Sequence, residues 1–167
     1  MRDFVPQRTV DDCVIAAFAT ATERSYEDVA TVMGFPCNSE TGKPSPLRIV
    51  GVNLWLLPVF LLSLGIRATM VPARKAADTK GRLPSSNELK ELLHGRSAVL
   101  FTPESKYPNT RALHALAWKD DEVIDCREPE GRGKELSELT LLGAMLLIEE
   151  KQVLTRNNGK NTGTEDA

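Results

Sequence analysis

The 167-residue chain carries almost no net charge, because 21 lysines and arginines face 23 aspartates and glutamates. Proteins that bind nucleic acid or an anionic surface by electrostatics concentrate positive charge, and no such excess is present. The sequence also lacks cysteines in the C-x-x-C spacing that is typical of metal sites. We therefore expect no nucleic-acid partner, no metal site and no cofactor.

Segments that would direct the chain into a membrane are also absent. The first residues contain no apolar run of signal-peptide length. The most apolar stretch, residues 49–64, is too short for a membrane span and contains Asn53 and Pro58, so it predicts a buried core helix. We expect a cytoplasmic protein without a membrane partner, whose three cysteines are free thiols.

The length and patterning of the chain predict one α+β domain over residues 1–154. Helices are expected over residues 13–22, 25–34 and 86–95. Strands are expected over residues 66–71 and 97–102, in a β-hairpin over residues 112–126, and in a closing strand before residue 150. Residues 155–167 lack large apolar side chains and predict a disordered tail. No pattern indicates the oligomeric state.

Cys13 stands where a polar segment gives way to a run of small and apolar residues, and so at the start of the first predicted helix. The helix dipole and unpaired backbone N–H groups at such a position favour the thiolate. Gln7 lies six residues upstream and can add an amide donor to the Cys13 backbone N–H, which together form an oxyanion hole. The alternative is a small core cysteine, which is the commoner role.

Asp11 and Asp12 directly precede Cys13 and allow two interpretations. Carboxylates close to the sulfur would disfavour its thiolate. Alternatively, they cap the helix and point away from the thiol.

His114 and Asp125 begin and close the predicted hairpin, at similar distances from the acidic turn at residues 120–122. Antiparallel pairing brings such residues together. A carboxylate bonded to one ring nitrogen fixes the tautomer and leaves the other nitrogen to take a thiol proton. Each residue also has a structural explanation, as a hydrogen-bonded strand histidine and as an acceptor for the loop at residues 127–133.

Two other candidates have weaker support. His94 lies in the last turn of a predicted helix, where a cation is favourable without any catalytic role. Cys37 falls in a loop over residues 35–48 that no helix follows, so the sequence does not favour it as a nucleophile.

In the order Gln7, Cys13, His114 and Asp125, the chain resembles the papain-like cysteine peptidases, and within them the peptidase C39-like group. The matching motifs are Gln7-x5-Cys13 with Asp12-Cys13 opening the helix, Leu113-His114-Ala115-Leu116-Ala117-Trp118, and Val123-Ile124-Asp125. The likeness covers roughly residues 5–149. It implies a papain-like fold, in which a helical part carries the nucleophile at a helix N-terminus and packs on an antiparallel β-sheet that carries the base.

The resemblance also implies a role for each residue. Cys13 would be the nucleophile, His114 the general base and acid, Asp125 the orienting carboxylate, and Gln7 the oxyanion donor. We therefore expect a cysteine peptidase-like hydrolase that cleaves a peptide or isopeptide bond of a peptide or protein substrate through an acyl-enzyme. Two alternatives stay open, an inactive papain-like module that binds a partner protein and an acyltransferase that uses the same triad.

Overall fold

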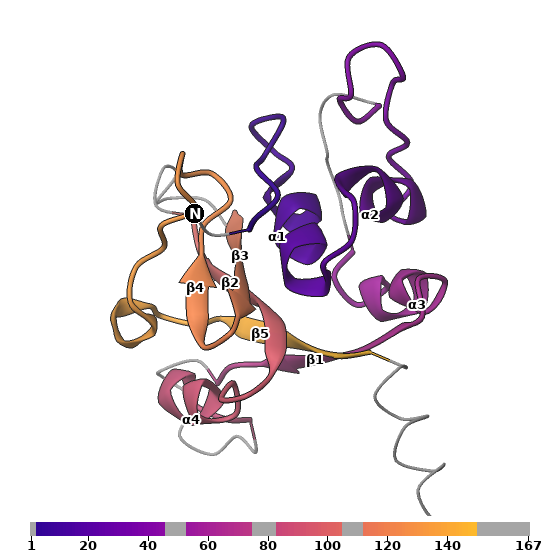
Figure 1. Cartoon of the computed structure of the whole chain (residues 1–167). Helices are drawn as coiled ribbons and strands as arrows, with labels where there is room; N and C mark the ends of the chain where they lie inside the picture. Colours follow the sequence, from indigo (N-terminus) through magenta and orange to yellow (C-terminus); the bar gives the residue numbers. More distant parts are fainter. Residues whose placement is uncertain (1–2, 46–52, 75–82, 105–111, 150–167) are drawn as a thin grey trace, which may run out of the picture.

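The computed structural model describes residues 3–45, 53–74, 83–104 and 112–149 (Figure 1). The predicted tail at residues 155–167 lies outside the described residues. The helices are α1 (Cys13–Thr22), α2 (Tyr26–Val32), α3 (Leu57–Leu62) and α4 (Ser86–Glu91), with the 3-10 turn η1 (Leu136–Glu138). The strands are β1 (Ile66–Pro72), β2 (Ser97–Pro103), β3 (Leu113–Lys119), β4 (Glu122–Ile124) and β5 (Gly143–Glu149).

The five strands form one sheet in the order β1-β5-β2-β3-β4, and every neighbouring pair is antiparallel. This confirms the α+β class and the antiparallel sheet. The closing strand β5 lies inside the sheet, where it pairs with β1 on one side and β2 on the other. The hairpin of β3 and β4 forms one edge of the sheet (Figure 1).

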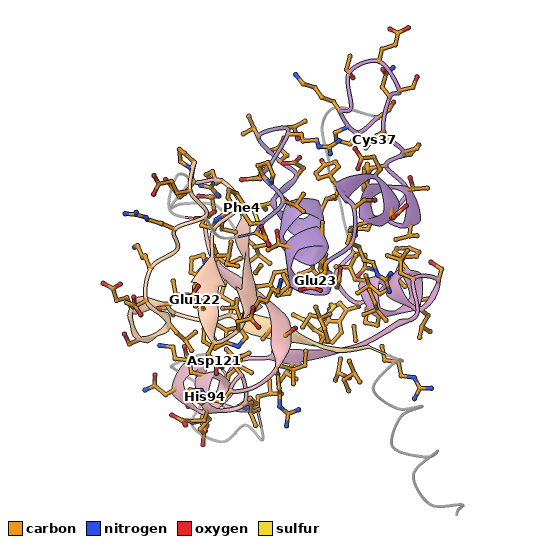
Figure 2. All side chains as sticks on the ribbon, viewed as in Figure 1. Phe4, Glu23, Cys37, His94, Asp121 and Glu122 are labelled. Carbon is orange, nitrogen blue, oxygen red and sulfur yellow. The ribbon has the colours of Figure 1, made fainter. Side chains whose placement is uncertain are left out.

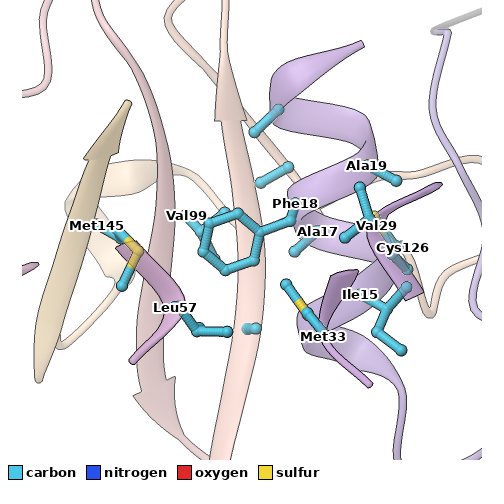
Figure 3. Packing of buried hydrophobic residues seen from close by; sticks show 14 of the residues in the cluster. Ile15, Ala17, Phe18, Ala19, Val29, Met33, Leu57, Val99, Cys126 and Met145 are labelled. Atoms are coloured by element: carbon cyan, nitrogen blue, oxygen red, sulfur yellow. The ribbon is translucent and has the colours of Figure 1, made fainter. Parts of the chain in front are cut away.

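Helices pack on both faces of the sheet. On one face, Phe18 of α1 lies beside Val99 of β2, as Figure 3 shows, in a cluster that also contains Met145 of β5. On the other face, a second cluster contains Leu89 of α4 and Trp118 of β3. Because both faces are covered, β2 and β3 are almost continuous apolar runs rather than alternating ones.

Small side chains set the position of α1 against the sheet. Four alanines of this helix are buried, and they allow its backbone to approach the sheet closely: Ala16, Ala17, Ala19 and Ala21. The helix ends at Glu23, whose left-handed backbone conformation (φ 54°) stops it. The first residue of α1, Cys13, is therefore fixed relative to the strands.

The prediction of a buried core helix over residues 49–64 is wrong in extent and in burial. The helix α3 begins only at Leu57, and residues 46–52 lie outside the described residues. Leu57 and Leu61 are buried, but Trp55 and Val59 are 66% and 62% exposed. Apolar composition alone did not reveal that only one side of this short helix meets the core. No helix within the described ranges is both long and apolar enough to cross a membrane.

Candidate active site

Cys13 is the first residue of α1, as the sequence predicts. The preceding residue, Asp12, occupies the N-cap position, and its carbonyl oxygen accepts from the Ala16 backbone N–H at 3.1 Å. The Cys13 side chain packs at the border of the main apolar cluster and is partly exposed. The thiol is therefore not sealed in the interior, and the dipole of a ten-residue helix points its positive end at the sulfur.

His114 and Asp125 are in direct contact, as the hairpin predicts. His114 Nε2 lies 3.0 Å from Asp125 Oδ1, and both side chains are mostly buried. Cross-strand register alone does not explain this contact, because β4 ends at Ile124, which pairs with Ala117. The chain then turns, with the Asp125 backbone N–H donating to the Gly131 carbonyl at 3.2 Å, and this turn directs the carboxylate toward His114.

The histidine also contacts Cys13, so the three predicted residues meet in one place. Burial by itself lowers the pKa of His114, but hydrogen bonds to Asp125 and to the Cys13 side chain outweigh burial and raise the pKa to about 9. Burial is the largest influence on Asp125 and raises its pKa, yet the hydrogen bond and charge of His114 together with the backbone N–H and charge of Arg127 outweigh it, and the net shift is downward. Both shifts favour an ionised Asp125 and a basic His114.

Gln7 is held beside this group by two hydrogen bonds. Its backbone N–H donates to the carbonyl oxygen of Cys126, the residue after Asp125, at 2.9 Å. Its side-chain Nε2 donates to Asp12 Oδ1 at 3.2 Å. An amide nitrogen carries two N–H groups, so the bond to Asp12 leaves a second one for another acceptor.

Asp12 was predicted either to oppose the thiolate or to cap α1, and the capping interpretation is wrong. Its carboxylate makes no cap hydrogen bond. Instead it is fully buried and accepts from the backbone N–H groups of Arg8 and Thr9, at 2.8 and 3.1 Å, and from the Tyr26 hydroxyl at 2.5 Å. With the bond from Gln7, these contacts make Asp12 the anchor of the loop before Cys13. Burial, followed by the bond to Asp12, raises the pKa of Tyr26.

Sequence reasoning missed two residues at this site, Arg127 and Glu104. Arg127 Nη1 and Nη2 donate to Glu104 Oε1 and Oε2 at 3.2 and 2.7 Å, and Nη2 also lies 2.5 Å from His114 Nδ1. Arg127 falls in the segment that the sequence identified only as a loop, residues 127–133, and Glu104 follows the strand expected over residues 97–102. The available signal was an arginine two positions after the predicted orienting aspartate.

The other cysteines and the other histidine lie elsewhere. Burial raises the pKa of Cys37, and it raises the pKa of Cys126 to about 12, so neither thiol is favoured as a thiolate. Figure 2 shows Cys37 on the loop after α2, while His94 lies with Asp121 at the opposite end of the view. Among the three free cysteines, Cys13 is the one in contact with a histidine.

No family model matches the chain, and a search of curated proteins finds no significant match.

Proposed function

We propose that the protein is a papain-like cysteine hydrolase, similar in its site to the peptidase C39-like group, that cleaves a peptide or isopeptide bond of a peptide or protein substrate. The observation that carries this proposal is the contact of His114 with both Cys13 and Asp125 at the N-terminus of α1. The packing of α1 on an antiparallel sheet supports the papain-like fold.

In the proposed reaction, the Cys13 thiol gives its proton to His114 Nδ1, and the sulfur attacks the carbonyl carbon of the substrate. The Cys13 backbone N–H and the second amide N–H of Gln7 donate to the oxyanion that forms. His114 then protonates the leaving amine, and an acyl group remains on the sulfur. Water attacks this thioester, gives a proton to His114, and releases the acid as the thiol is restored.

The surrounding residues support this reaction by position. Asp125 accepts at Nε2, which leaves Nδ1 for the thiol proton and stabilises the imidazolium that forms. Asp12 accepts from the Gln7 amide and fixes its orientation before the substrate binds. A donor that is already oriented stabilises the transition state without reorganisation at the moment of reaction.

One observation favours a second candidate, the inactive binding module. Arg127 Nη2 lies 2.5 Å from His114 Nδ1, the nitrogen that accepts the Cys13 proton in the proposed reaction. A third possibility, acyl transfer, differs from hydrolysis only in that an amine rather than water attacks the thioester, so both reactions depend on the same residues.

Reaction with a peptidyl electrophile, followed by digestion of a complex peptide mixture, tests the proposal. We expect stoichiometric labelling at Cys13 and new peptide termini, both abolished in Cys13→Ala and retained in the matched variant Cys37→Ala. Gln7→Ala should slow peptide turnover but leave alkylation by iodoacetamide unchanged, because alkylation forms no oxyanion. Equal labelling of Cys13→Ala and the wild type would contradict the proposal, and a labelled protein without turnover would favour the binding module.

A further inference from the structure

Four titratable or charged residues surround His114 in the described part of the chain. Cys13 comes from α1, Glu104 follows β2, and Asp125 and Arg127 follow β4. The hydrogen-bond partner of His114 Nε2 is Asp125, and the partner of Nδ1 is Arg127. The two ring nitrogens therefore have different partners, a carboxylate on one side and a guanidinium on the other.

The contact between Arg127 and Nδ1 defines which protonation state it fits. A guanidinium has only donors, so Nη2 at 2.5 Å from Nδ1 requires that Nδ1 offer its lone pair. A proton on Nδ1 would place two N–H groups against each other. The contact thus fits a neutral His114 that donates from Nε2 to Asp125, together with Cys13 as a thiol.

Arg127 is held firmly in this place. Both of its terminal nitrogens bond Glu104, whose side chain is only 10% exposed, and its backbone N–H donates to Asp125 Oδ1 at 3.0 Å. A paired fork of this kind fixes both the distance and the plane of the guanidinium. The contact between Arg127 and His114 Nδ1 is therefore held in place by hydrogen bonds between the segments that follow β2 and β4.

We propose that Arg127, held by Glu104, is a positioning residue whose contact with Nδ1 of His114 competes with the Cys13 proton and so lowers, without abolishing, the fraction of Cys13 that is thiolate before a substrate binds. This inference rests on the proposed function. When the guanidinium leaves Nδ1, the Cys13 proton transfers to that nitrogen and gives a thiolate and an imidazolium, with no change in total charge. A carbonyl or carboxylate oxygen of a bound substrate is the acceptor that competes for Arg127.

Two influences on the protonation of His114 oppose each other. Asp125 and Cys13 outweigh the opposing effect of burial and raise the pKa of His114 to about 9, whereas the Arg127 contact favours the neutral ring. Both influences act in the same arrangement, because His114 contacts Cys13 and Arg127 together, so the Arg127 contact opposes proton transfer to Nδ1 without abolishing it.

Alkylation of Cys13 by iodoacetamide, followed by site-resolved mass spectrometry across a range of pH, tests this inference. Arg127→Met removes the donors and the charge but keeps the apolar stem. We expect it to alkylate about tenfold faster than the wild type at mildly acidic pH, the change that one pKa unit produces. The midpoint of the pH profile should move to lower pH. The matched control is Arg132→Met, because Arg132 is 80% exposed and pairs only with Glu130 at the surface in the described contacts.

A second variant, Arg127→Lys, distinguishes two effects of Arg127: occupation of His114 Nδ1 by the guanidinium, and stabilisation of the Cys13 thiolate by its positive charge. Lysine keeps the charge but cannot bond both oxygens of Glu104 and Nδ1 in one plane, so we expect this variant also to react faster than the wild type. If Arg127 only stabilised the thiolate by its charge, Arg127→Met would react more slowly and Arg127→Lys would match the wild type, which would overturn the inference. If Arg127→Met does not fold, Arg127→Lys decides.

The result is distinguishable from failure of the proposed function. Unchanged rates in both Arg127 variants, with His114→Ala slowing alkylation, would overturn the role of Arg127 alone. Alkylation of Cys13 that does not depend on His114 would overturn the proposed function itself.

Discussion

The chain has two histidines, and each lies near an aspartate, but the two pairs differ in burial. His114 Nε2 is 3.0 Å from Asp125, with side chains 9% and 17% exposed. His94 Nδ1 is 3.7 Å from Asp121, with side chains 66% and 53% exposed. Exposed pairs contribute little because water screens them. The comparison teaches that burial and a neighbouring sulfur, rather than the pair of residue types, make a candidate site.

The surroundings of the two pairs sharpen this contrast. His94 borders a cleft of about 600 Å³ at the C-terminal end of α1, with Glu23 and Lys119 among its lining residues. Those two side chains form an ion pair at 2.5 Å, which lowers the pKa of Glu23 through the hydrogen bond from Lys119. At the N-terminal end of α1, the Asp12 carboxylate is buried and accepts hydrogen bonds from the loop that carries Gln7. An open polar cleft does not by itself locate chemistry.

The largest effect on the reactivity of Cys13 is expected from removing His114, with removal of His94 as the comparison. His114→Ala should slow alkylation of Cys13 at neutral pH by about a hundredfold, because no base remains to accept the thiol proton. His94→Ala is the matched control and should leave the rate unchanged. Site-resolved mass spectrometry measures both, and equal effects of the two variants would remove the distinction between the pairs.

The buried carboxylate at the Cys13 end is expected to dominate stability. Asp12→Asn should lower the free energy of unfolding by about 2 kcal/mol, because an amide cannot accept from all four of its donors. Asp121→Asn should change it by less than about 0.5 kcal/mol, since that side chain is exposed. Urea unfolding measures both values. Similar losses of unfolding free energy in the two variants would show that burial of the carboxylate does not make the N-terminal end of α1 more important for stability.

Exchanging the orienting carboxylate should have a smaller effect on reactivity. Asp125→Asn should slow alkylation of Cys13 by about tenfold, because the lost charge no longer raises the pKa of His114 and the thiol proton finds a weaker base. Asp121→Asn should leave the rate as it is in the wild type. If the Asp125 variant kept the wild-type rate, the carboxylate would have only a structural role.

The smallest effect is a pH dependence of stability. Burial raises the pKa of Asp125, but His114 and Arg127 together outweigh burial and hold the pKa below 3.8, so the unfolded chain binds its proton first as pH falls. The stability that Asp125 contributes is present above 3.8 and is lost as pH falls through the folded-state pKa. The difference in unfolding free energy between wild type and Asp125→Asn should therefore narrow in acid. A difference that widens would contradict the direction of the shift.

Local patterns were enough to predict part of the site, whereas contacts between distant loops were not. Cys13 at a helix start, and His114 near Asp125 in one hairpin, follow from neighbouring residues and turn chemistry. The bond from Tyr26 to Asp12 depends on how α2 folds back on α1, and the pair of Arg127 with Glu104 joins two loops that carry no periodicity. No pattern in the sequence encodes such contacts.

The fold, too, could be predicted from local patterns but not in its contacts between distant segments. Each strand could be recognised from its own apolar run and turn residues, but its neighbour in the sheet could be predicted only for the hairpin of β3 and β4. The position of β5 between β1 and β2 depends on packing against both faces, which hydrophobicity does not specify. Residues 49–64 were misjudged for a related reason, because apolar composition does not tell which side of a helix meets the core.

The reactivity of Cys13 is best tested by comparing two thiols within one molecule. Iodoacetamide is added to the wild-type protein at mildly acidic pH, and the rates at Cys13 and Cys37 are measured by mass spectrometry. We expect Cys13 to react about a hundredfold faster, because His114 takes its proton at a helix N-terminus while burial raises the pKa of Cys37. Equal rates at the two cysteines would show that Cys13 and His114 do not form a reactive pair.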